Sequence, residues 1–283
     1  MKASDIDIPL VSVEWLADNI RKQQLIVLNA TLPKATAANN QGGVSEDRIP
    51  GARFFDIKNT FSISDAPFPN TRVDEPTFNK SAQALGINQD SWIIVYDDHG
   101  IYSSARAWWM FKAMGHIKVA VLDGGLPAWK RSGLSTEKKT IETYPTGNFN
   151  GQYQVSYFKD SEDVLKDLDN DNELVLDARA EDRFAGLVEE PRKGLRSGHI
   201  PHSSNIPYTD LLNNGKMKSV SELRILMEKA LLKDKNITFS CGSGITACVL
   251  ALGATLVGKS ELSVYDGSWT EWGSVMSLPI EKE

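Results

Sequence analysis

The sequence predicts an α/β protein with two similar halves, each a mainly parallel sheet flanked by helices on both faces. Two observations support this prediction. Short apolar segments typical of buried strands alternate with segments of helical periodicity. The same pieces then recur in the same order in the second half of the chain. Because strands that alternate with helices form crossover units around a parallel sheet, the pattern indicates the α/β class.

Four pairs of segments make up the repeat. A predicted strand or turn of the first half matches one of the second half in each pair: 25–30 with 174–178, 48–52 with 199–203, 93–97 with 237–241, and 119–125 with 262–268. Helical patterns over 105–114 and 245–256 follow the third pair. Asp97 therefore stands in the first half where Cys241 stands in the second.

The length of the chain, 283 residues, is sufficient for two domain cores. Residues 132–154 are rich in Thr, Lys, Gly and Asn and lack sustained periodicity, which is typical of a connection. We therefore expect a first domain over 1–140, a linker over 141–154 and a second domain over 155–283.

Composition excludes several classes of function. The net charge of -6 and the scattered basic residues argue against nucleic-acid binding. No apolar run approaches the roughly 18 residues that span a bilayer, so no membrane association is expected. The N-terminal sequence has neither signal-peptide nor transit-peptide character, which predicts a cytoplasmic protein. Nothing in the sequence indicates a disulfide framework, a metal site, a dinucleotide fingerprint or another cofactor.

Cys241 is the main candidate for chemistry. It follows a predicted buried strand and opens the loop Cys241-Gly242-Ser243-Gly244-Ile245-Thr246-Ala247, which leads into a helix. The N–H groups of such a loop and the N-terminus of the helix favour an anion, and a thiolate is the anion that cysteine supplies. Gly242 and Gly244 allow the close backbone approach that a loop around one sulfur atom requires. Cys248, about two turns further along the helix, is expected to pack in the core.

Several motifs together resemble one family. The loop matches a CG(S/T)GVTA pattern with Ile245 in place of Val, and further matches are Asp177-Ala178-Arg179-Ala180, Arg183-Phe184, Glu189-Glu190-Pro191-Arg192, Ser197-Gly198-His199-Ile200-Pro201 and Tyr265-Asp266-Gly267-Ser268-Trp269. By these motifs the chain resembles the rhodanese superfamily, and within it the 3-mercaptopyruvate sulfurtransferases. The resemblance covers nearly the whole chain. It implies two tandem rhodanese-like domains, the first non-catalytic and the second catalytic.

The resemblance also implies a reaction. Cys241 would take the sulfur of 3-mercaptopyruvate as a persulfide, release pyruvate, and pass the sulfur to cyanide or to a thiol acceptor such as thioredoxin or a small thiol. Backbone N–H groups of residues 242–247 would stabilise the persulfide. Arg183 and Arg192 would bind the carboxylate and carbonyl of the substrate, because a guanidinium fork suits a planar α-keto acid.

Other functions of the same loop stay open. The thiosulfate branch of the family typically has a basic CRKGVTA-type loop, since a doubly charged donor should prefer a cationic loop, whereas Gly242 and Ser243 are neutral. A non-enzymatic persulfide carrier would keep the loop and use Arg183 and Arg192 for no substrate. A phosphatase would need an arginine six positions after the cysteine, where Ala247 stands.

Ser243 has a second implied role in which this sequence departs from the family. The loop serine of this branch has been proposed to act in a relay with a His and an Asp of the first domain. The Pro-His of the family is Pro69-Asn70 here. A neutral Asn cannot transfer protons as His does.

We therefore predict activity without a catalytic histidine. Introducing one by Asn70→His should leave kcat for mercaptopyruvate well short of the ~100-fold gain that general acid–base catalysis supplies. Steady-state kinetics of the two proteins test this, and a gain of ~100-fold would contradict the prediction.

Overall fold

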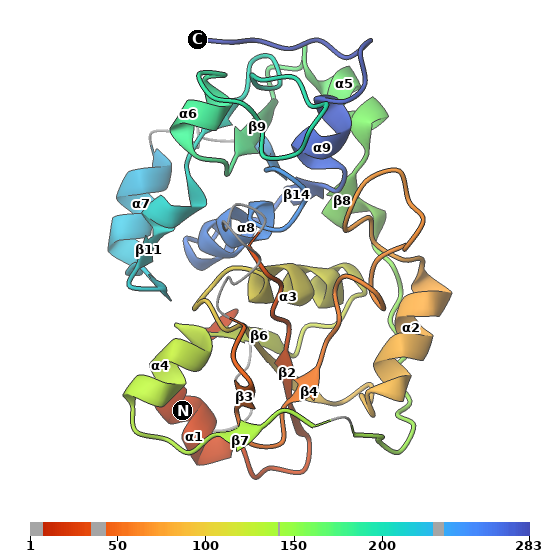
Figure 1. The fold of residues 1–283 in the computed structure, drawn as a ribbon, viewed down its shortest axis with the longest axis vertical. Coiled ribbons are helices and arrows are strands. Elements are labelled where there is room, and N and C mark those ends of the chain that lie inside the picture. Colours follow the sequence, from red (N-terminus) through yellow and green to blue (C-terminus); the bar gives the residue numbers. More distant parts are fainter. Residues whose placement is uncertain (1–7, 35–43, 141, 229–234) are drawn as a thin grey trace. The chain divides into compact units, whose positions relative to one another are not determined.

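The computed structural model describes residues 8–34, 44–140, 142–228 and 235–283. The chain divides into two compact units. The first unit contains Met1–Ile63, Arg72–Gln154 and Asn214–Met217, and the second unit contains Ser64–Thr71, Val155–Asn213 and Lys218–Glu283. A short segment of each half of the chain thus folds with the other unit. Figure 1 shows the elements of both units.

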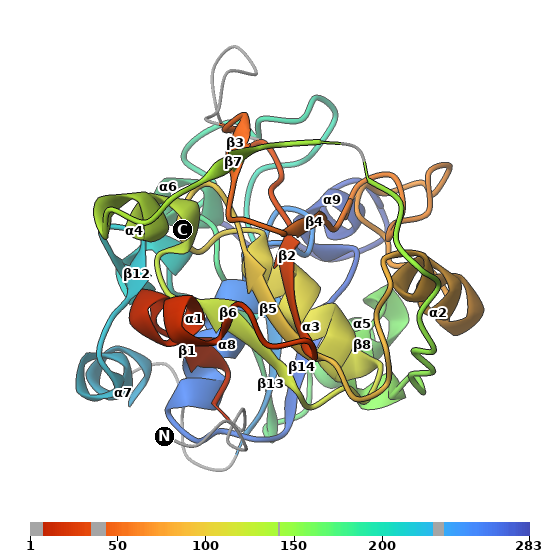
Figure 2. The same ribbon diagram turned by 90° about the horizontal axis from the view of Figure 1, so that it is seen from below.

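The first unit contains a parallel sheet of five strands in the order β1-β6-β5-β2-β4. Its strands are β1 (Leu10–Val11), β2 (Leu25–Asn29), β4 (Arg53–Phe54), β5 (Trp92–Tyr96) and β6 (Val119–Leu122). Figure 2 shows β2, β5 and β6 side by side. A separate antiparallel pair joins β3 (Asp47–Arg48) to β7 (Glu137–Lys138).

Helices cover both faces of this sheet. They are α1 (Val13–Asn19), α2 (Glu75–Ala84), α3 (Ser104–Ala113) and α4 (Gly125–Arg131). Leu16 of α1 and Trp129 of α4 are buried against Val27 and Leu122 of the sheet. Successive residues of a strand point to opposite faces of the sheet. The strand residues that alternate with those facing α1 and α4 therefore face α3, which packs on β5 and β6. An aromatic cluster extends the core on the α3 side of the sheet. In it the ring of Phe78 contacts four other phenylalanine rings.

The second unit repeats the arrangement, with a five-stranded parallel sheet in the order β10-β9-β13-β14-β8. Its strands are β8 (Phe158–Lys159), β9 (Glu173–Asp177), β10 (Ser204–Asn205), β13 (Asn236–Ser240) and β14 (Leu262–Tyr265). Short strands β11 (Leu212–Asn213) and β12 (Lys216–Met217) pair separately. The predicted α/β class and the predicted repeat are therefore confirmed.

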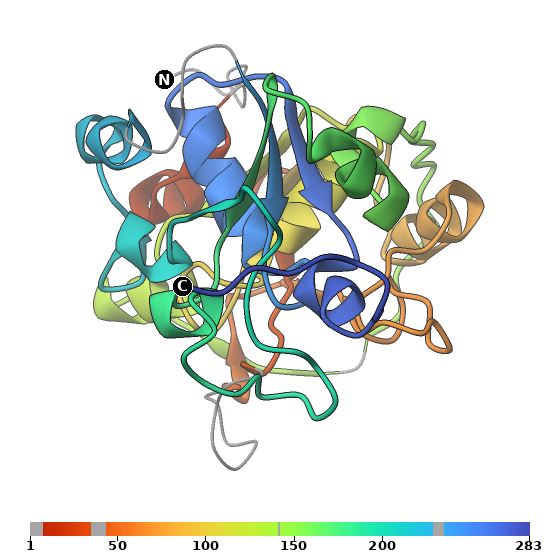
Figure 3. The ribbon, with the colours of Figure 1, turned by 90° about the horizontal axis from the view of Figure 1, so that it is seen from above.

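The helices of the second half are α5 (Ser161–Asp167), α6 (Glu181–Phe184), α7 (Val220–Glu228), α8 (Ala247–Leu256) and α9 (Ser268–Trp272), with 3-10 turns η2 (Val155–Tyr157) and η3 (Tyr208–Leu211). Helix α8 packs on β13 and β14 (Figure 3). It is apolar and buried along nearly its whole length, and Cys248 within it is fully buried. Trp269 and Trp272 of α9 pack with Val164 of α5 in a core cluster of the second unit. No described helix has the length and apolarity needed to cross a membrane.

The aromatic cluster of the first unit predicts a stability effect. Phe78 is 2% exposed, so Phe78→Ala should lower the free energy of unfolding of this unit by about 3–5 kcal/mol through lost burial and a residual cavity. Phe54 is 51% exposed and serves as the control, since Phe54→Ala should change stability by no more than ~0.5 kcal/mol. Urea unfolding followed by circular dichroism measures both, and equal midpoints for the two variants would contradict the assignment of the core.

Candidate active site

Cys241 lies at the turn between a strand and a helix, as predicted. Strand β13 ends at Ser240, and α8 begins at Ala247. Cys241 is buried, with only 1% of its surface exposed. Gly244 has a φ of +73°, a conformation that residues with a Cβ rarely adopt, so a glycine is required for this course of the loop.

Helix α9 donates hydrogen bonds to the carbonyl oxygens at the start of the loop. The Trp269 N–H donates to the Cys241 carbonyl at 2.9 Å, and the Thr270 N–H donates to the Gly242 carbonyl at 2.9 Å. The Thr270 hydroxyl donates to the Gly242 carbonyl as well. A trans peptide directs its C=O and the following N–H to opposite sides. The N–H groups of Gly242 and Ser243 therefore point away from α9.

The later carbonyl groups of the loop also have donors. The Cys248 thiol donates to the Gly244 carbonyl at 3.4 Å. The backbone N–H groups of Cys248 and Val249 donate to the carbonyls of Ile245 and Thr246 at 3.2 Å and 3.0 Å. With its carbonyl oxygens paired, the loop has its remaining hydrogen-bonding capacity in its N–H groups.

Most of these N–H groups are unpaired. Within the described residues, no acceptor is found for the N–H groups of Gly242, Ser243, Ile245, Thr246 and Ala247. Gly244 is different, because its N–H donates to the Ser268 hydroxyl. Ser243, Ile245 and Ala247 are buried, and buried N–H groups without acceptors are rare in proteins. Successive N–H groups at a helix N-terminus form an anion site. The geometry is therefore that of a loop built around an anion.

The equivalent loop of the first unit contains its own anion. The carboxylate of Asp97 accepts the N–H groups of His99, Tyr102 and Ser104 at 2.9, 2.8 and 2.9 Å. The Ser104 hydroxyl adds a fourth hydrogen bond at 2.6 Å. Asp97 holds the position of Cys241, since each follows the central strand of its sheet. In the first unit a carboxylate thus satisfies the donors that the second unit leaves for another anion.

The structure brings the two predicted arginines to the cysteine loop. Arg183 lies on α6 and Arg192 in the segment that follows. A Cβ added at Gly242 would lie 3.3 Å from Nη2 of Arg183 and 3.8 Å from Nη1 of Arg192. The Arg192 guanidinium also reaches the hydroxyls of Ser243 and Thr270 at 3.4 and 3.5 Å. Gly242 therefore leaves room for both guanidinium groups beside the loop backbone.

Glu190 is a site residue that the sequence reasoning did not identify. Its side chain is only 2% exposed and accepts from Nε and Nη2 of Arg183 and from Nη1 of Arg179. Arg179 in turn pairs with Asp177 at 2.7 Å and stacks on Trp269. Burial alone would lower the pKa of the Arg179 guanidinium, but the two carboxylates outweigh it and raise that pKa above its ordinary value.

The ion pairs also show where positive charge is left over. The carboxylates of Asp177 and Glu190 balance the guanidinium groups of Arg179 and Arg183. No carboxylate in the described part of the chain forms an ion pair with Arg192. Arg192 therefore supplies the uncompensated positive charge next to the loop. The motif quoted for the family contained Glu190, but nothing in the sequence distinguished it from its exposed neighbour Glu189.

Asn70 contacts Ser243 directly. It lies in the segment Ser64–Thr71, which belongs to the second unit. Its Nδ2 donates to the carbonyl oxygen of Ser243 at 3.2 Å and to the Ser243 Oγ at 3.1 Å. Because a carbonyl oxygen can only accept, the amide nitrogen must face it, and the Ser243 hydroxyl accepts from the same group. The hydroxyl hydrogen of Ser243 is then directed elsewhere.

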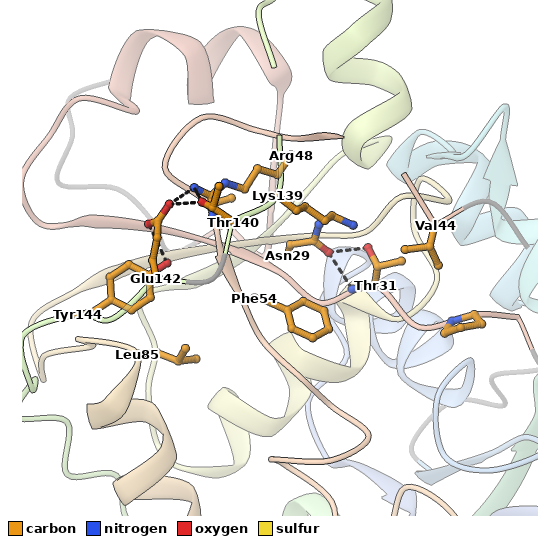
Figure 4. A pocket seen from close by; sticks show the side chains of 12 residues that line it. Asn29, Thr31, Val44, Arg48, Phe54, Leu85, Lys139, Thr140, Glu142 and Tyr144 are labelled. Atoms are coloured by element: carbon orange, nitrogen blue, oxygen red, sulfur yellow. Dashed lines mark hydrogen bonds and ion pairs between the residues drawn. The ribbon is translucent and has the colours of Figure 1, made fainter. Parts of the chain in front are cut away.

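The first unit has a cavity of about 510 Å³, drawn in Figure 4. Its charged side chains already have partners, and Lys139 among them pairs with Asp98 at 3.1 Å. Arg48 binds Glu137 and Glu142, and Asn29 accepts from the N–H and hydroxyl of Thr31. No cluster of three or more metal-ligating side chains occurs in the part of the chain that is described. The cysteine loop therefore remains the candidate active site.

Fold and site together define a rhodanese-type protein, and the chain belongs to the rhodanese family. The model of the rhodanese-like domain matches residues 12–132 and 160–274. The 3-mercaptopyruvate sulfurtransferase of Mus musculus is 40% identical over 282 residues, covering 96% of this chain and 94% of that protein. The thiosulfate sulfurtransferase of Mus musculus is 36% identical over 272 residues, covering 93% and 91%. The crystal structure of SseA from Escherichia coli, a 3-mercaptopyruvate sulfotransferase, matches with a TM-score of 0.82 and 34% identity, covering 93% of this chain and 99% of that one.

The geometry predicts that Glu190 positions Arg183. A Glu190→Gln variant retains the size of the side chain but loses the bidentate carboxylate, so kcat/KM for a keto-acid donor should fall by about tenfold, mainly in kcat, because a misplaced guanidinium disturbs the attack geometry. The exposed neighbour provides the matched control, and Glu189→Gln should match the wild type. Equal kinetics for the two variants would remove Glu190 from the site.

Proposed function

We propose that the chain is a 3-mercaptopyruvate sulfurtransferase in which Cys241 carries the transferred sulfur as a persulfide. The observation that best supports this proposal is the loop that begins at Cys241, with five backbone N–H groups that have no acceptor in the described residues. Two guanidinium groups lie beside this loop, next to Gly242. A sulfur anion and a carboxylate-bearing donor are the species that such a site stabilises.

The proposed reaction balances without a cofactor. The Cys241 thiolate attacks the thiol sulfur of 3-mercaptopyruvate, so a sulfur–sulfur bond forms and the carbon–sulfur bond breaks. The enolate of pyruvate leaves with the electron pair of that bond and takes up the proton of the substrate thiol. A Cys241 persulfide anion is left. An acceptor thiol or cyanide then attacks the outer sulfur and restores the thiolate.

The site residues act on the two charges that this reaction develops. The unpaired N–H groups of residues 242, 243 and 245–247 would donate to the persulfide anion. Arg192, whose charge is uncompensated, would bind the substrate carboxylate, and Arg183, held by Glu190, would polarise the keto oxygen as the enolate forms. This division of roles agrees with the neutral side chains of the loop, because the positive charge that binds the substrate comes from arginines outside the loop.

Ser243 would contribute as a donor in this scheme. Its Oγ accepts from Asn70 and lies 3.4 Å from Nη2 of Arg192, so its own hydrogen is left for the substrate oxygen or for sulfur. Asn70 then orients the serine without taking a proton. The proton that the enolate needs comes from the substrate, which is why the reaction does not require a histidine at this position.

Thiosulfate sulfurtransferase is the second candidate function. The identity of 36% to the mouse thiosulfate enzyme is close to the 40% to the mouse mercaptopyruvate enzyme, so overall similarity does not separate the two donors. Charge favours mercaptopyruvate, because thiosulfate is a dianion without a keto group and the loop itself has no cationic side chain. We further propose a small thiol or a thioredoxin-like protein as the acceptor.

The donor preference and the nucleophile can be tested together. We expect kcat/KM for 3-mercaptopyruvate to exceed that for thiosulfate by more than ~10-fold, since only the keto acid uses both arginines. Cys241→Ser should abolish the transfer of sulfur and the release of pyruvate, while Cys248→Ser, the matched control on α8, should retain them.

Other results would lead to the rival functions. A preference for thiosulfate would replace the proposed donor. An absence of turnover with either donor, or a persulfide yield that Arg183→Ala leaves unchanged, would support a non-enzymatic persulfide carrier.

A further inference from the structure

Ser268, the first residue of α9, has an unusual backbone conformation. Its φ is +49°, although it has a Cβ and is completely buried. The other described non-glycine residues with positive φ are Asn70, His202 and Asn214, types that are enriched in this region. Serine has no such enrichment, and left-handed backbone costs energy for any residue with a Cβ. A buried residue kept under this strain indicates a function for its side chain.

The Ser268 hydroxyl connects the two ends of the turn that begins at Cys241. Its Oγ accepts the Cys241 N–H at 3.2 Å and the Gly244 N–H at 3.1 Å, and it donates to the Tyr265 carbonyl at 2.8 Å. A hydroxyl offers one donor hydrogen and two acceptor lone pairs, so its capacity is fully used. The hydroxyl therefore holds the N–H groups at residues 241 and 244 at a fixed separation.

The first unit contains the same backbone arrangement without the hydroxyl. Gly125 stands at the position of Ser268, as the first residue of the helix after the corresponding strand, and has a φ of +52°. The next N–H, that of Leu126, donates to the Asp97 carbonyl at 3.0 Å, just as the Trp269 N–H donates to the Cys241 carbonyl. The two units thus differ at this point by one side chain.

The consequence of that difference is visible in the turn. In the first unit Asp97 and Gly100 form a backbone bridge with each other. A Cβ added at Gly125 would lie 2.3 Å from the Asp97 carbonyl oxygen and 2.6 Å from that of Gly100, so this turn has no room for a serine. In the second unit the serine hydroxyl takes the place of the bridge.

We propose that Ser268 is a positioning residue for sulfur transfer, which keeps the turn from Cys241 to Gly244 open so that the unpaired N–H groups surround the sulfur atom. The inference rests on the proposed function, since it assumes that Cys241 carries the sulfur. It adds a residue outside the loop, on α9, that determines whether the loop binds a persulfide or closes as in the first unit.

Ser268→Gly is the main test, because glycine adopts a φ of +49° without strain, and this relief offsets part of the loss of the hydroxyl's hydrogen bonds, so the variant should fold. Its rate of persulfide formation from 3-mercaptopyruvate should fall by roughly 10- to 100-fold, with KM little changed because both arginines remain. Ser268→Ala, which removes only the hydroxyl, should lose a similar factor. Ser263→Ala removes another buried hydroxyl of this unit, one that bonds Thr238, and should match the wild type.

A second measurement separates this inference from the proposed function. The rate of Cys241 alkylation by iodoacetamide against pH, read by mass spectrometry that resolves Cys241 from Cys248, needs no sulfur donor. That rate should be lower in Ser268→Gly than in the wild type across the pH range, because a closed turn directs fewer N–H groups at the sulfur. A wild type that alkylates normally but forms no persulfide would overturn the function alone, whereas Ser268→Gly with wild-type persulfide formation and a wild-type alkylation profile would overturn the role of Ser268.

Discussion

The direction of the peptide groups in one short loop is the constraint on which the rest of the site depends. A peptide unit that gives its carbonyl oxygen to a donor on one side must present the next N–H on the other side. Helix α9, the Asn70 side chain and the first turn of α8 together occupy the carbonyl oxygens of residues 241 to 246. The N–H groups are left to donate to a bound anion, so the loop can bind an anion without any charged side chain of its own.

The charged groups form a separate system with a different purpose. Arg179, buried between Asp177 and Glu190 and stacked on Trp269, is neutralised by its partners and supports the carboxylate that fixes Arg183. A buried ion pair of this kind costs desolvation and contributes little net stability, but it imposes a definite geometry. Arg192 takes no part in these ion pairs, and in our proposal its charge binds the substrate carboxylate. The proposed function thus gives the positioning of the keto group and the binding of the carboxylate to different arginines.

The two units show how one fold supports two outcomes. Both place an anion-binding loop after the central strand of a five-stranded parallel sheet. In the first unit the Asp97 carboxylate accepts N–H groups of its own loop, and Gly125 lies against the turn from Asp97 to Gly100. In the second unit a cysteine takes that position and Ser268 occupies the turn. The two loops therefore differ in a few side chains and in one turn, and in our proposal these differences make the second loop the reactive one.

The sequence by itself determined the features that depend on local pattern. Alternating apolar segments predicted the two parallel sheets, and the position of Cys241 between a buried strand and an apolar helix predicted the loop correctly. Its motifs also singled out Arg183 and Arg192, whose guanidinium groups the structure places beside Gly242. The remaining features join segments far apart in the chain, and only the tertiary structure decided them: Asn70 reaches Ser243 because residues 64–71 fold with the second unit. Glu190 and Ser268 resemble any other glutamate and serine until folding buries the carboxylate between two guanidinium groups and places the hydroxyl against two loop N–H groups.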